Sequence, residues 1–203
     1  MDLVLIRHPA VAIEPGICYG SSDVPLAADA ASGAASILAR LNALGVRAPA
    51  RIETSPLTRC ASVARELAHQ LADGHGALVP HDDARLAEMD FGAWERQRWD
   101  GIERSQIDAW AADFLHARDH GGESVAQFDA RVSAWFASLD ADQHDARATI
   151  WAVAHAGVIR TIAARALGAP LERCVRWPLE MAAIVVLKRE SASGEWMLAR
   201  WNA

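Results

Sequence analysis

The first segment of the chain that can form a strand, Leu3 to Ile6, is a continuous run of apolar residues. A short run without polar alternation is typical of a strand buried on both faces of a sheet. Arg7 and His8 follow directly, at the carboxyl end where open α/β sheets place their ligands. A fixed cation beside a group that titrates near neutrality suits an anionic substrate and proton or phosphoryl transfer. An isolated Arg-His pair is more often structural, so the remaining chain has to decide between these roles.

A second segment of the chain repeats this pattern. Residues Thr149 to Ala154 predict another buried strand, and His155 follows it as His8 follows the first. Gly157 and an apolar stretch of helical spacing then continue to Leu167, which places His155 beside a helix N-terminus, where free N–H groups favour anions. A single histidine at a strand end is readily structural. Two histidines at equivalent strand ends favour a shared site.

The remaining periodicity alternates between helical and extended patterns. It predicts helices at 27–44, from Ser55 through Leu71, at 99–116 and at 125–139, the last with Ser124 and Gln127 as a capping box, and strands at 51–54 and 77–81. Residues 182–188 and 196–201 predict an antiparallel hairpin around 191–194. The expected fold class is α/β, a three-layer α/β/α arrangement with a mostly parallel sheet, an antiparallel edge hairpin and helices on both faces. No linker divides the sequence, so residues 1–203 are expected to form one domain.

One arginine is placed near these strand ends by a helix signal. Ser55 and Pro56 are typical of the N-cap and first position of a helix, which puts Arg59 in or just beyond the first turn. There it can join an anion pocket, although a solvated helical arginine is the alternative. The segment from Ala10 to Asp23 is rich in turn residues and is expected to form a loop facing the substrate.

Acidic side chains gather in an irregular stretch from Asp82 to Glu95. Glycine and aromatic residues interrupt it, so periodicity cannot place Glu88 or Glu95 on a face. The residues alone therefore leave the choice of an acid-base group open.

A metal pair is conceivable at His116 and His120, which are spaced four residues apart. Gly121 and Gly122 break a helix at that point, and no third ligand is evident, so the pattern argues against a metal site.

Composition limits the partners and the compartment. The formal net charge of −6 argues against nucleic acid and anionic membrane surfaces, and no run is long and apolar enough to span a bilayer. The three cysteines, Cys18, Cys60 and Cys174, suggest neither a disulfide framework nor a zinc ligand set. Without a basic, apolar leader, the chain is expected in the cytoplasm.

Taken in order, the pieces resemble the histidine phosphatase superfamily, the phosphoglycerate mutase-like branch, over nearly the whole chain. Four stretches carry the resemblance. They are Leu5-Ile6-Arg7-His8-Pro9, Thr54-Ser55-Pro56-Leu57-Thr58-Arg59-Cys60, Leu86-Ala87-Glu88-Met89-Asp90-Phe91-Gly92-Ala93-Trp94-Glu95 and Ala154-His155-Ala156-Gly157-Val158-Ile159-Arg160.

The resemblance implies a role for each motif. His8 would be the nucleophile that becomes phosphorylated, Arg7, Arg59 and His155 would clamp the phosphoryl oxygens, and Glu88 would be the acid-base. Two arginines and a second histidine supply the charge that phosphoryl transfer requires, so neither metal nor cofactor is implied. The substrate would be a small-molecule phosphomonoester.

The loop from Cys18 to Leu26 is similar to that of α-ribazole phosphatases, which act late in the assembly of the cobalamin nucleotide loop. This similarity implies α-ribazole 5′-phosphate as substrate. Further substrate contacts are expected from residues of this loop and of the second histidine motif: Tyr19, Gly20, Ser21 and Ala156.

Four residues depart from the family pattern. Pro9, Ala156 and Arg96 stand where glycine is usual, and Glu14 stands where a polar phosphate contact is common. Two alternatives therefore stay open, a phosphoglycerate mutase and a binding module that has lost turnover. Residues for the nucleophile, the clamp and the acid are all present, and the mutases of this family usually carry longer lid segments. Both points favour hydrolysis.

Overall fold

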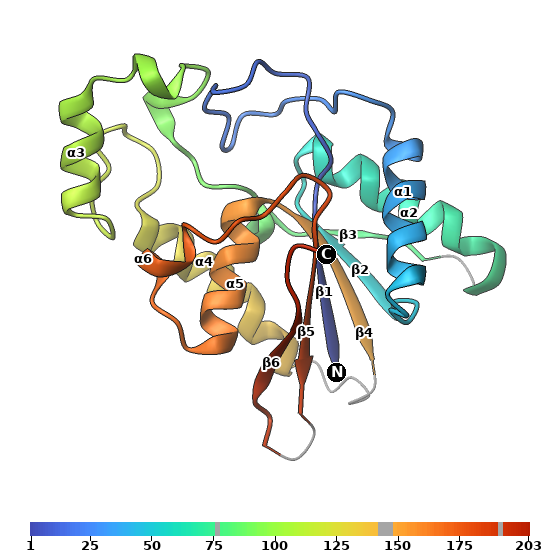
Figure 1. The fold of residues 1–203 in the computed structure, drawn as a ribbon. Coiled ribbons are helices and arrows are strands. Elements are labelled where there is room, and N and C mark those ends of the chain that lie inside the picture. Colours follow the sequence, from blue (N-terminus) through green and yellow to red (C-terminus); the bar gives the residue numbers. More distant parts are fainter. Residues whose placement is uncertain (76–77, 142–147, 191–192) are drawn as a thin grey trace.

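The computed structural model describes residues 1–75, 78–141, 148–190 and 193–203. A six-stranded sheet in the order β3-β2-β4-β1-β5-β6 forms its centre (Figure 1). The strands are β1 (Asp2–Arg7), β2 (Arg51–Thr54), β3 (His81–Asp82), β4 (Thr149–Ala154), β5 (Ile184–Arg189) and β6 (Trp196–Arg200). The first four are parallel, while β5 is antiparallel to both β1 and β6. The predicted mixed sheet with an antiparallel edge hairpin is confirmed; residues 191–192 of its turn lie outside the described residues.

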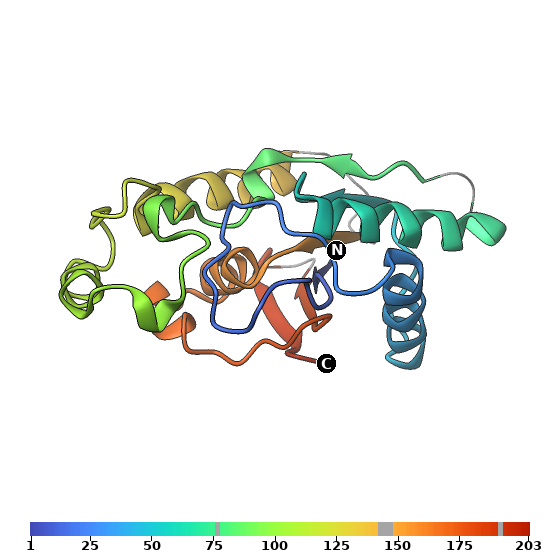
Figure 2. The same cartoon turned by 90° about the horizontal axis from the view of Figure 1, so that it is seen from above.

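Helices cover both faces of the sheet, as the three-layer prediction requires (Figures 1 and 2). They are α1 (Ala30–Ala43), α2 (Thr58–His75), α3 (Arg104–Ala112), α4 (Val125–Ala141), α5 (Ala156–Leu167) and α6 (Leu171–Cys174), with the 3₁₀ turns η1 (Ala84–Leu86), η2 (Gly92–Trp94) and η3 (Trp99–Gly101). Among the described helices, none combines the length and apolarity that a membrane span requires.

Strand β1 separates two apolar cores. Leu3 and Leu5 pack with α4 and α5, whereas Val4 and Ile6 pack with α1 and α2. Successive side chains of a strand point to opposite faces, so an uninterrupted apolar run is what this position demands.

Three predicted elements differ from the observed ones by more than a small shift of their bounds. Helix α2 begins at Thr58 rather than Ser55. Asp23, from the loop before α1, accepts a 2.8 Å hydrogen bond from the Thr58 N–H and so caps the helix there. The expected strand 77–81 pairs only at His81 and Asp82, and Ala77 lies outside the described residues. The expected helix 99–116 divides into η3, α3 and turns, because Ile102 packs with Trp94 in a small separate core.

The parallel strands end at one edge of the sheet, at the top of Figure 1. Two irregular segments, 8–29 and 83–124, lie over this edge. The capping box predicted at Ser124 and Gln127 is confirmed by reciprocal hydrogen bonds of 2.9 and 3.2 Å, and it ends the second segment where α4 begins.

Candidate active site

His8 follows β1 directly and is only 2% exposed. Its Nδ1 lies 2.7 Å from the carbonyl oxygen of Pro9, so Nδ1–H donates and Nε2 keeps its lone pair. Burial lowers the pKa of His8 to about 3, with the charges of Arg59 and Arg7 acting in the same direction, against the effect of the bond to Pro9. The ring is therefore neutral at physiological pH, as a nitrogen nucleophile must be.

His155 follows β4 and is fully buried at the N-cap position of α5. Its ring centroid lies 5.2 Å from that of His8. Arg59 Nε donates to His155 Nδ1 at 3.3 Å, and His155 Nε2 lies 2.7 Å from Ser55 Oγ. Burial, and then the charge of Arg59, lowers the pKa of His155 well below its usual value. Both histidines are therefore neutral, and the fixed positive charge comes from the arginines.

Arg59 is a fully buried cation in the first turn of α2. Its Nη1 and Nη2 donate to the carbonyl oxygens of Ser22 and Gly20 at 2.8 and 2.7 Å, and its guanidinium lies over the Tyr19 ring. These contacts fix the guanidinium beside the two histidines, so the solvated alternative for this arginine is wrong.

Arg7 ends β1 and donates from Nη1 to the carbonyl oxygen of Leu179. Its Nε is also buried, but among the polar groups of the described residues it finds no partner. An unpaired buried donor is costly, and an anionic ligand would satisfy it.

The loop before α1 reaches the site through Tyr19 and Gly20 but not through Ser21. Gly20 is required by close packing, since a Cβ there would lie 2.0 Å from the carbonyl oxygen of Met89. Ser21 instead donates from N and Oγ to Glu95 Oε1, at 2.7 and 2.8 Å. The structure therefore does not bring Ser21 to the cavity.

Of the acidic residues from Asp82 to Glu95, Glu88 is the one that shares a cavity with His8. Its Oε2 accepts from the N–H of Gly157 at 3.0 Å, and a Cβ on Gly157 would lie 2.3 Å from Oε1, so glycine is needed there. Glu95 accepts instead from Ser21, Ser22 and Phe91. Although burial opposes it, these hydrogen bonds hold the pKa of Glu95 below its usual value.

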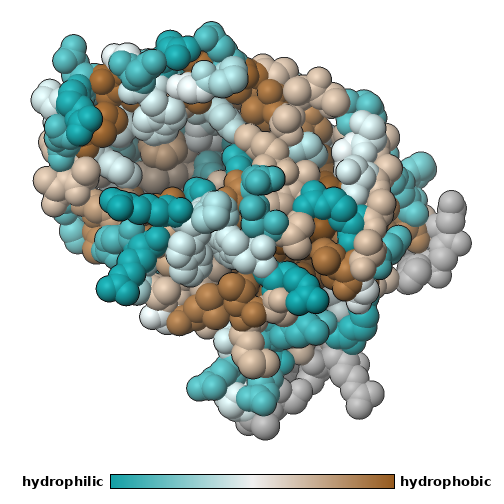
Figure 3. Space-filling model, in the orientation of Figure 1, coloured by the Kyte–Doolittle hydropathy of each residue, from teal (hydrophilic) through white to brown (hydrophobic). Residues whose placement is uncertain are grey.

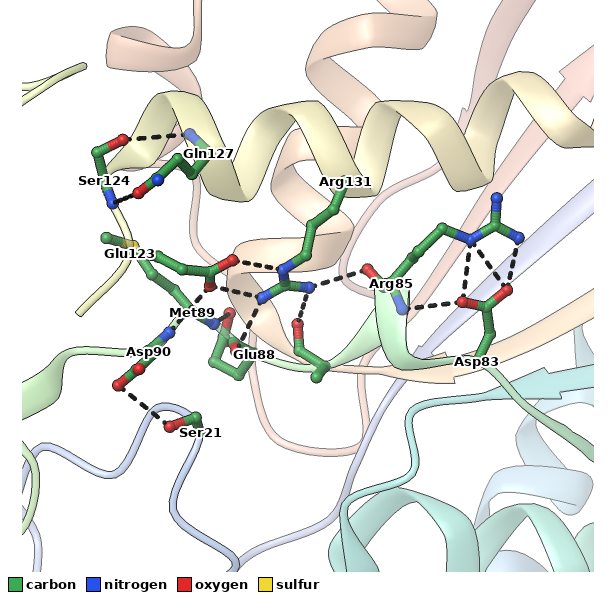
Figure 4. Close-up of polar contacts among 11 residues, drawn as sticks. Ser21, Asp83, Arg85, Glu88, Met89, Asp90, Glu123, Ser124, Gln127 and Arg131 are labelled. Atoms are coloured by element: carbon green, nitrogen blue, oxygen red, sulfur yellow. Dashed lines mark hydrogen bonds and ion pairs between the residues drawn. The ribbon is translucent and has the colours of Figure 1, made fainter.

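Arg131 of α4 holds the segment that carries Glu88 (Figure 4). It donates from Nη1 to the carbonyl oxygens of Arg85 and Ala87, at 3.0 and 2.8 Å, and from Nη2 to that of Glu88 at 3.0 Å. Glu123 pairs with the same guanidinium at 2.7 and 2.8 Å. Sequence reasoning missed Arg131.

These side chains enclose a cavity of about 270 Å³, which we call the charged pocket. Its lining consists of Arg7, His8, Ile17, Tyr19, Gly20, Arg59, Glu88, Phe91, Trp99, His155 and Arg160. The structure thus brings together every candidate catalytic residue. Ala156, expected to contact substrate, lines an adjoining cavity instead. Arg160, which the sequence analysis gave no role, lines both.

The departures from the family pattern lie at defined places. Glu14 does not line the charged pocket and pairs with Arg98 at 2.7 Å. Arg96 has a φ of 65°, a conformation that favours glycine. Pro9 supplies the carbonyl that orients His8.

Metal-ligating side chains gather away from the charged pocket. Glu53, His81 and Asp83 place ligand atoms within 4.8 Å of one another, but Arg51 already pairs with Glu53 and Arg85 with Asp83. The pair suggested by sequence does not form on a helix, because α3 ends at Ala112; His116 is exposed and His120 is buried.

Comparison with known proteins agrees with this geometry. A family model described as histidine phosphatase superfamily (branch 1) matches residues 3–203. The adenosylcobalamin/alpha-ribazole phosphatase of Escherichia coli (strain K12) is 34% identical over 90 residues, a match that spans 43% of this chain and 43% of that protein. The alpha-ribazole phosphatase of Shigella flexneri superposes with a TM-score of 0.83 at 27% identity, covering 100% of this chain and 96% of that one. A mycobacterial glucosyl-3-phosphoglycerate phosphatase in complex with VO3 gives 0.81 at 28% identity, covering 100% and 98%.

Proposed function

This chain belongs to the histidine phosphatase superfamily, branch 1, and on that premise we propose that it is a metal-independent phosphomonoesterase working through a phosphohistidine at His8. The observation that carries the proposal is the state of His8. Its ring is neutral, its Nδ1–H is committed to Pro9, which leaves Nε2 as the free nitrogen, and the residue lines one cavity with Arg7 and Arg59. Residues 1–203 act in this proposal as one domain.

In the first half of the reaction, His8 Nε2 attacks phosphorus and the ester P–O bond breaks. Arg7 and Arg59 stabilise the charge on the three equatorial oxygens, and the neutral His155 joins them when its Nε2–H turns from Ser55 Oγ to a phosphoryl oxygen. Glu88, protonated when the substrate binds, gives its proton to the departing oxygen, which leaves as a neutral alcohol. The products of this half are the alcohol, phosphohistidine and a Glu88 carboxylate.

In the second half, the Glu88 carboxylate takes a proton from a water molecule that attacks phosphorus. The P–N bond breaks, inorganic phosphate leaves, and His8 returns to its neutral form. Gly157 N–H and Met89 N–H donate to the two carboxyl oxygens of Glu88 at 3.0 and 3.1 Å, which holds the group in one place for both halves of the reaction.

We propose α-ribazole 5′-phosphate as the substrate, in the assembly of the cobalamin nucleotide loop. The names of the relatives from Escherichia coli and Shigella flexneri support this choice, as does the loop from Cys18 to Leu26. In the structure, this loop packs Tyr19 against Arg59 and delivers Gly20 to the charged pocket.

The test is to trap the intermediate. The enzyme is mixed with ³²P-labelled p-nitrophenyl phosphate in excess EDTA, quenched in base, and digested for mass spectrometry. We expect base-stable, acid-labile label on the peptide that contains His8 and none on the His8→Ala protein. Label on another residue, or activity that EDTA abolishes and magnesium or zinc restores, would overturn the proposal.

A further inference from the structure

A second cavity, of about 260 Å³, adjoins the charged pocket, and we call it the apolar chamber. Its walls come from the segment before α3, from α3 itself and the turn after it, and from α4, α5 and α6: Glu88, Met89, Phe91, Trp110, Phe114, Val125, Phe128, Ala156, Gly157, Arg160, Thr161, Leu171, Cys174 and Val175. Figure 3 shows a hollow on this face, between the segment that carries α3 and helix α5, with residues of apolar colour inside it.

The two cavities share Glu88, Phe91 and Arg160. His8 lines only the charged pocket, so Glu88 stands on the boundary between the nucleophile and the chamber. In phosphoryl transfer the attacking and leaving oxygen or nitrogen atoms lie roughly in line through phosphorus. A leaving oxygen protonated by Glu88 therefore emerges at the boundary, and the carbon skeleton beyond it enters the chamber.

From this arrangement we infer that the apolar chamber binds the leaving group, so that the enzyme selects phosphomonoesters whose alcohol carries a flat, apolar ring system larger than benzene. The inference rests on the proposed function, because Glu88 has to face the leaving oxygen. Size sets the ring: a cavity of about 150 Å³ binds benzene, and this chamber is larger.

The largely apolar lining of the chamber argues against acidic leaving groups. Among the described residues that line it, Glu88 and Arg160 alone are charged, and Arg160 Nε already donates to the carbonyl oxygen of Trp177 at 2.9 Å. A carboxylate would lose its hydration among the apolar walls of the chamber, which is unfavourable. An apolar ring has no such cost and gains contact with aromatic walls such as Phe114 and Phe128.

The chamber is open enough to receive a ligand without unfolding. Val175 at its edge is 46% exposed, whereas Phe128 and Leu171 deeper in the wall are 4% and 8% exposed. A substitution at Val175 can therefore change the exposed edge of the chamber with little effect on the core, because substitutions at exposed positions have little effect on the free energy of unfolding.

Two substrate pairs test the inference. The value of kcat/KM is measured for 2-(2-naphthyl)ethyl phosphate against ethyl phosphate, and for α-ribazole 5′-phosphate against ribose 5-phosphate. Each pair keeps the reacting ester and differs in the ring, and burial of a ring predicts a preference of about 10²- to 10³-fold. A third comparison sets 3-phosphoglycerate, whose leaving group is carboxylated, against 2-(2-naphthyl)ethyl phosphate. 3-Phosphoglycerate should be the poorer substrate of the two.

The variant Val175→Asp places a carboxylate at the exposed edge of the chamber. We expect it to reduce the ratio of kcat/KM for naphthylethyl over ethyl phosphate by about tenfold. Val79→Asp is the matched control, because Val79 is 84% exposed and lines neither cavity. It should leave the ratio unchanged.

Equilibrium dialysis with free 2-(2-naphthyl)ethanol measures binding to the chamber without turnover. We expect saturable binding by the wild type that Val175→Asp weakens and Val79→Asp does not. Hydrolysis of both members of each pair at similar rates, together with naphthylethanol binding that Val175→Asp leaves unchanged, would overturn the inference and leave the proposed function standing. Failure to form phosphohistidine, with naphthylethanol still bound in the chamber, would overturn the proposed function instead.

Discussion

The charged pocket and the apolar chamber have similar volumes and share Glu88, yet they are built in opposite ways. The charged pocket takes its reacting groups from strand ends and one helix start, where the backbone fixes Arg7, His8, Arg59 and His155. The chamber takes its walls from helix faces and a long irregular segment. Irregular segments tolerate change better than the strands and helices that they connect. The comparison teaches that strand ends and a helix start hold the nucleophile and its clamp, while the acid-base and the selection of the leaving group belong to the surrounding segments.

The largest expected effect is in the charged pocket. His8→Ala should lower kcat/KM on the order of 10⁴- to 10⁶-fold, the range seen when a member of a nucleophilic triad is removed. Because every ester must be attacked by the same nitrogen, whatever its leaving group, the loss should be the same for naphthylethyl and ethyl phosphate. A loss that depends on the leaving group would mean that His8 belongs functionally with the chamber.

The loss of activity in Glu88→Gln, unlike that in His8→Ala, should depend on the leaving group. A general acid contributes about 10²- to 10⁴-fold when the leaving group is poor and little when it is a stable phenolate. Alkyl phosphates should lose most of this factor, while p-nitrophenyl phosphate should still phosphorylate His8 and give a burst of nitrophenolate before slow hydrolysis.

Asp90→Asn and Glu95→Gln are the controls for Glu88, because both carboxylates lie in the same segment but outside the two cavities. The selective pattern in either of them, or equal slowing of both substrates by Glu88→Gln without a burst, would place the acid elsewhere.

Arg131→Lys should have a smaller effect of the same kind. Arg131 donates three hydrogen bonds to the backbone of the Glu88 segment and two to Glu123, and a lysine can replace only part of them. A displacement of about 1 Å in a reacting group can cost up to about 10²-fold. The loss should be greater for alkyl than for aryl phosphates. Arg165→Lys is the control, because Arg165 forms an exposed ion pair with Asp129. An equal loss for both ester types in Arg131→Lys would mean that Arg131 has only a structural role.

The smallest expected effect concerns stability and pH. The pKa of His8 is lowered from its ordinary value of 6.5 to about 3 in the folded chain. Between these two pH values the unfolded chain binds a proton at His8 and the folded chain does not. Stability is therefore lost as the pH falls through this range, by about 2 kcal/mol from His8 between pH 6.5 and 4.5.

Urea unfolding at the two pH values measures this loss. His8→Gln should remove its share of the dependence, whereas the chamber variant Val175→Asp and the exposed-site variant His116→Gln should keep it. An unchanged dependence in His8→Gln would show that burial does not hold this ring neutral.

The sequence predicted the sheet better than its surroundings. The bounds of β2 and β4 match the prediction. β4 is a fully buried run that is apolar apart from Thr149, whereas β2 is a short mixed segment that ends where Ser55 and Pro56 begin the next helix signal. The edge strand β3 has no such run, since His81 and Asp82 are exposed. The start of α2 was misplaced because its cap comes from Asp23, far away in the sequence.

The site divides in the same way. Arg7, His8 and His155 were visible as polar residues at buried strand ends, but Glu88 needed the family resemblance because its segment has no periodicity. Arg131 carried a signal that was missed: it lies three residues after Phe128 and four before Trp135, on the buried stripe of α4. The chamber was not predicted, because no local pattern connects walls that run from Glu88 to Val175.

The most direct test of the division between the two regions is a crystal structure of the enzyme with vanadate and 2-(2-naphthyl)ethanol. The account predicts vanadium at His8 Nε2, with Arg7 and Arg59 on its oxygens, and the naphthyl ring in the chamber near Phe128 and Leu171. Vanadate bound away from His8, or a vanadate ester at His8 with its ring outside the chamber in solvent, would contradict it.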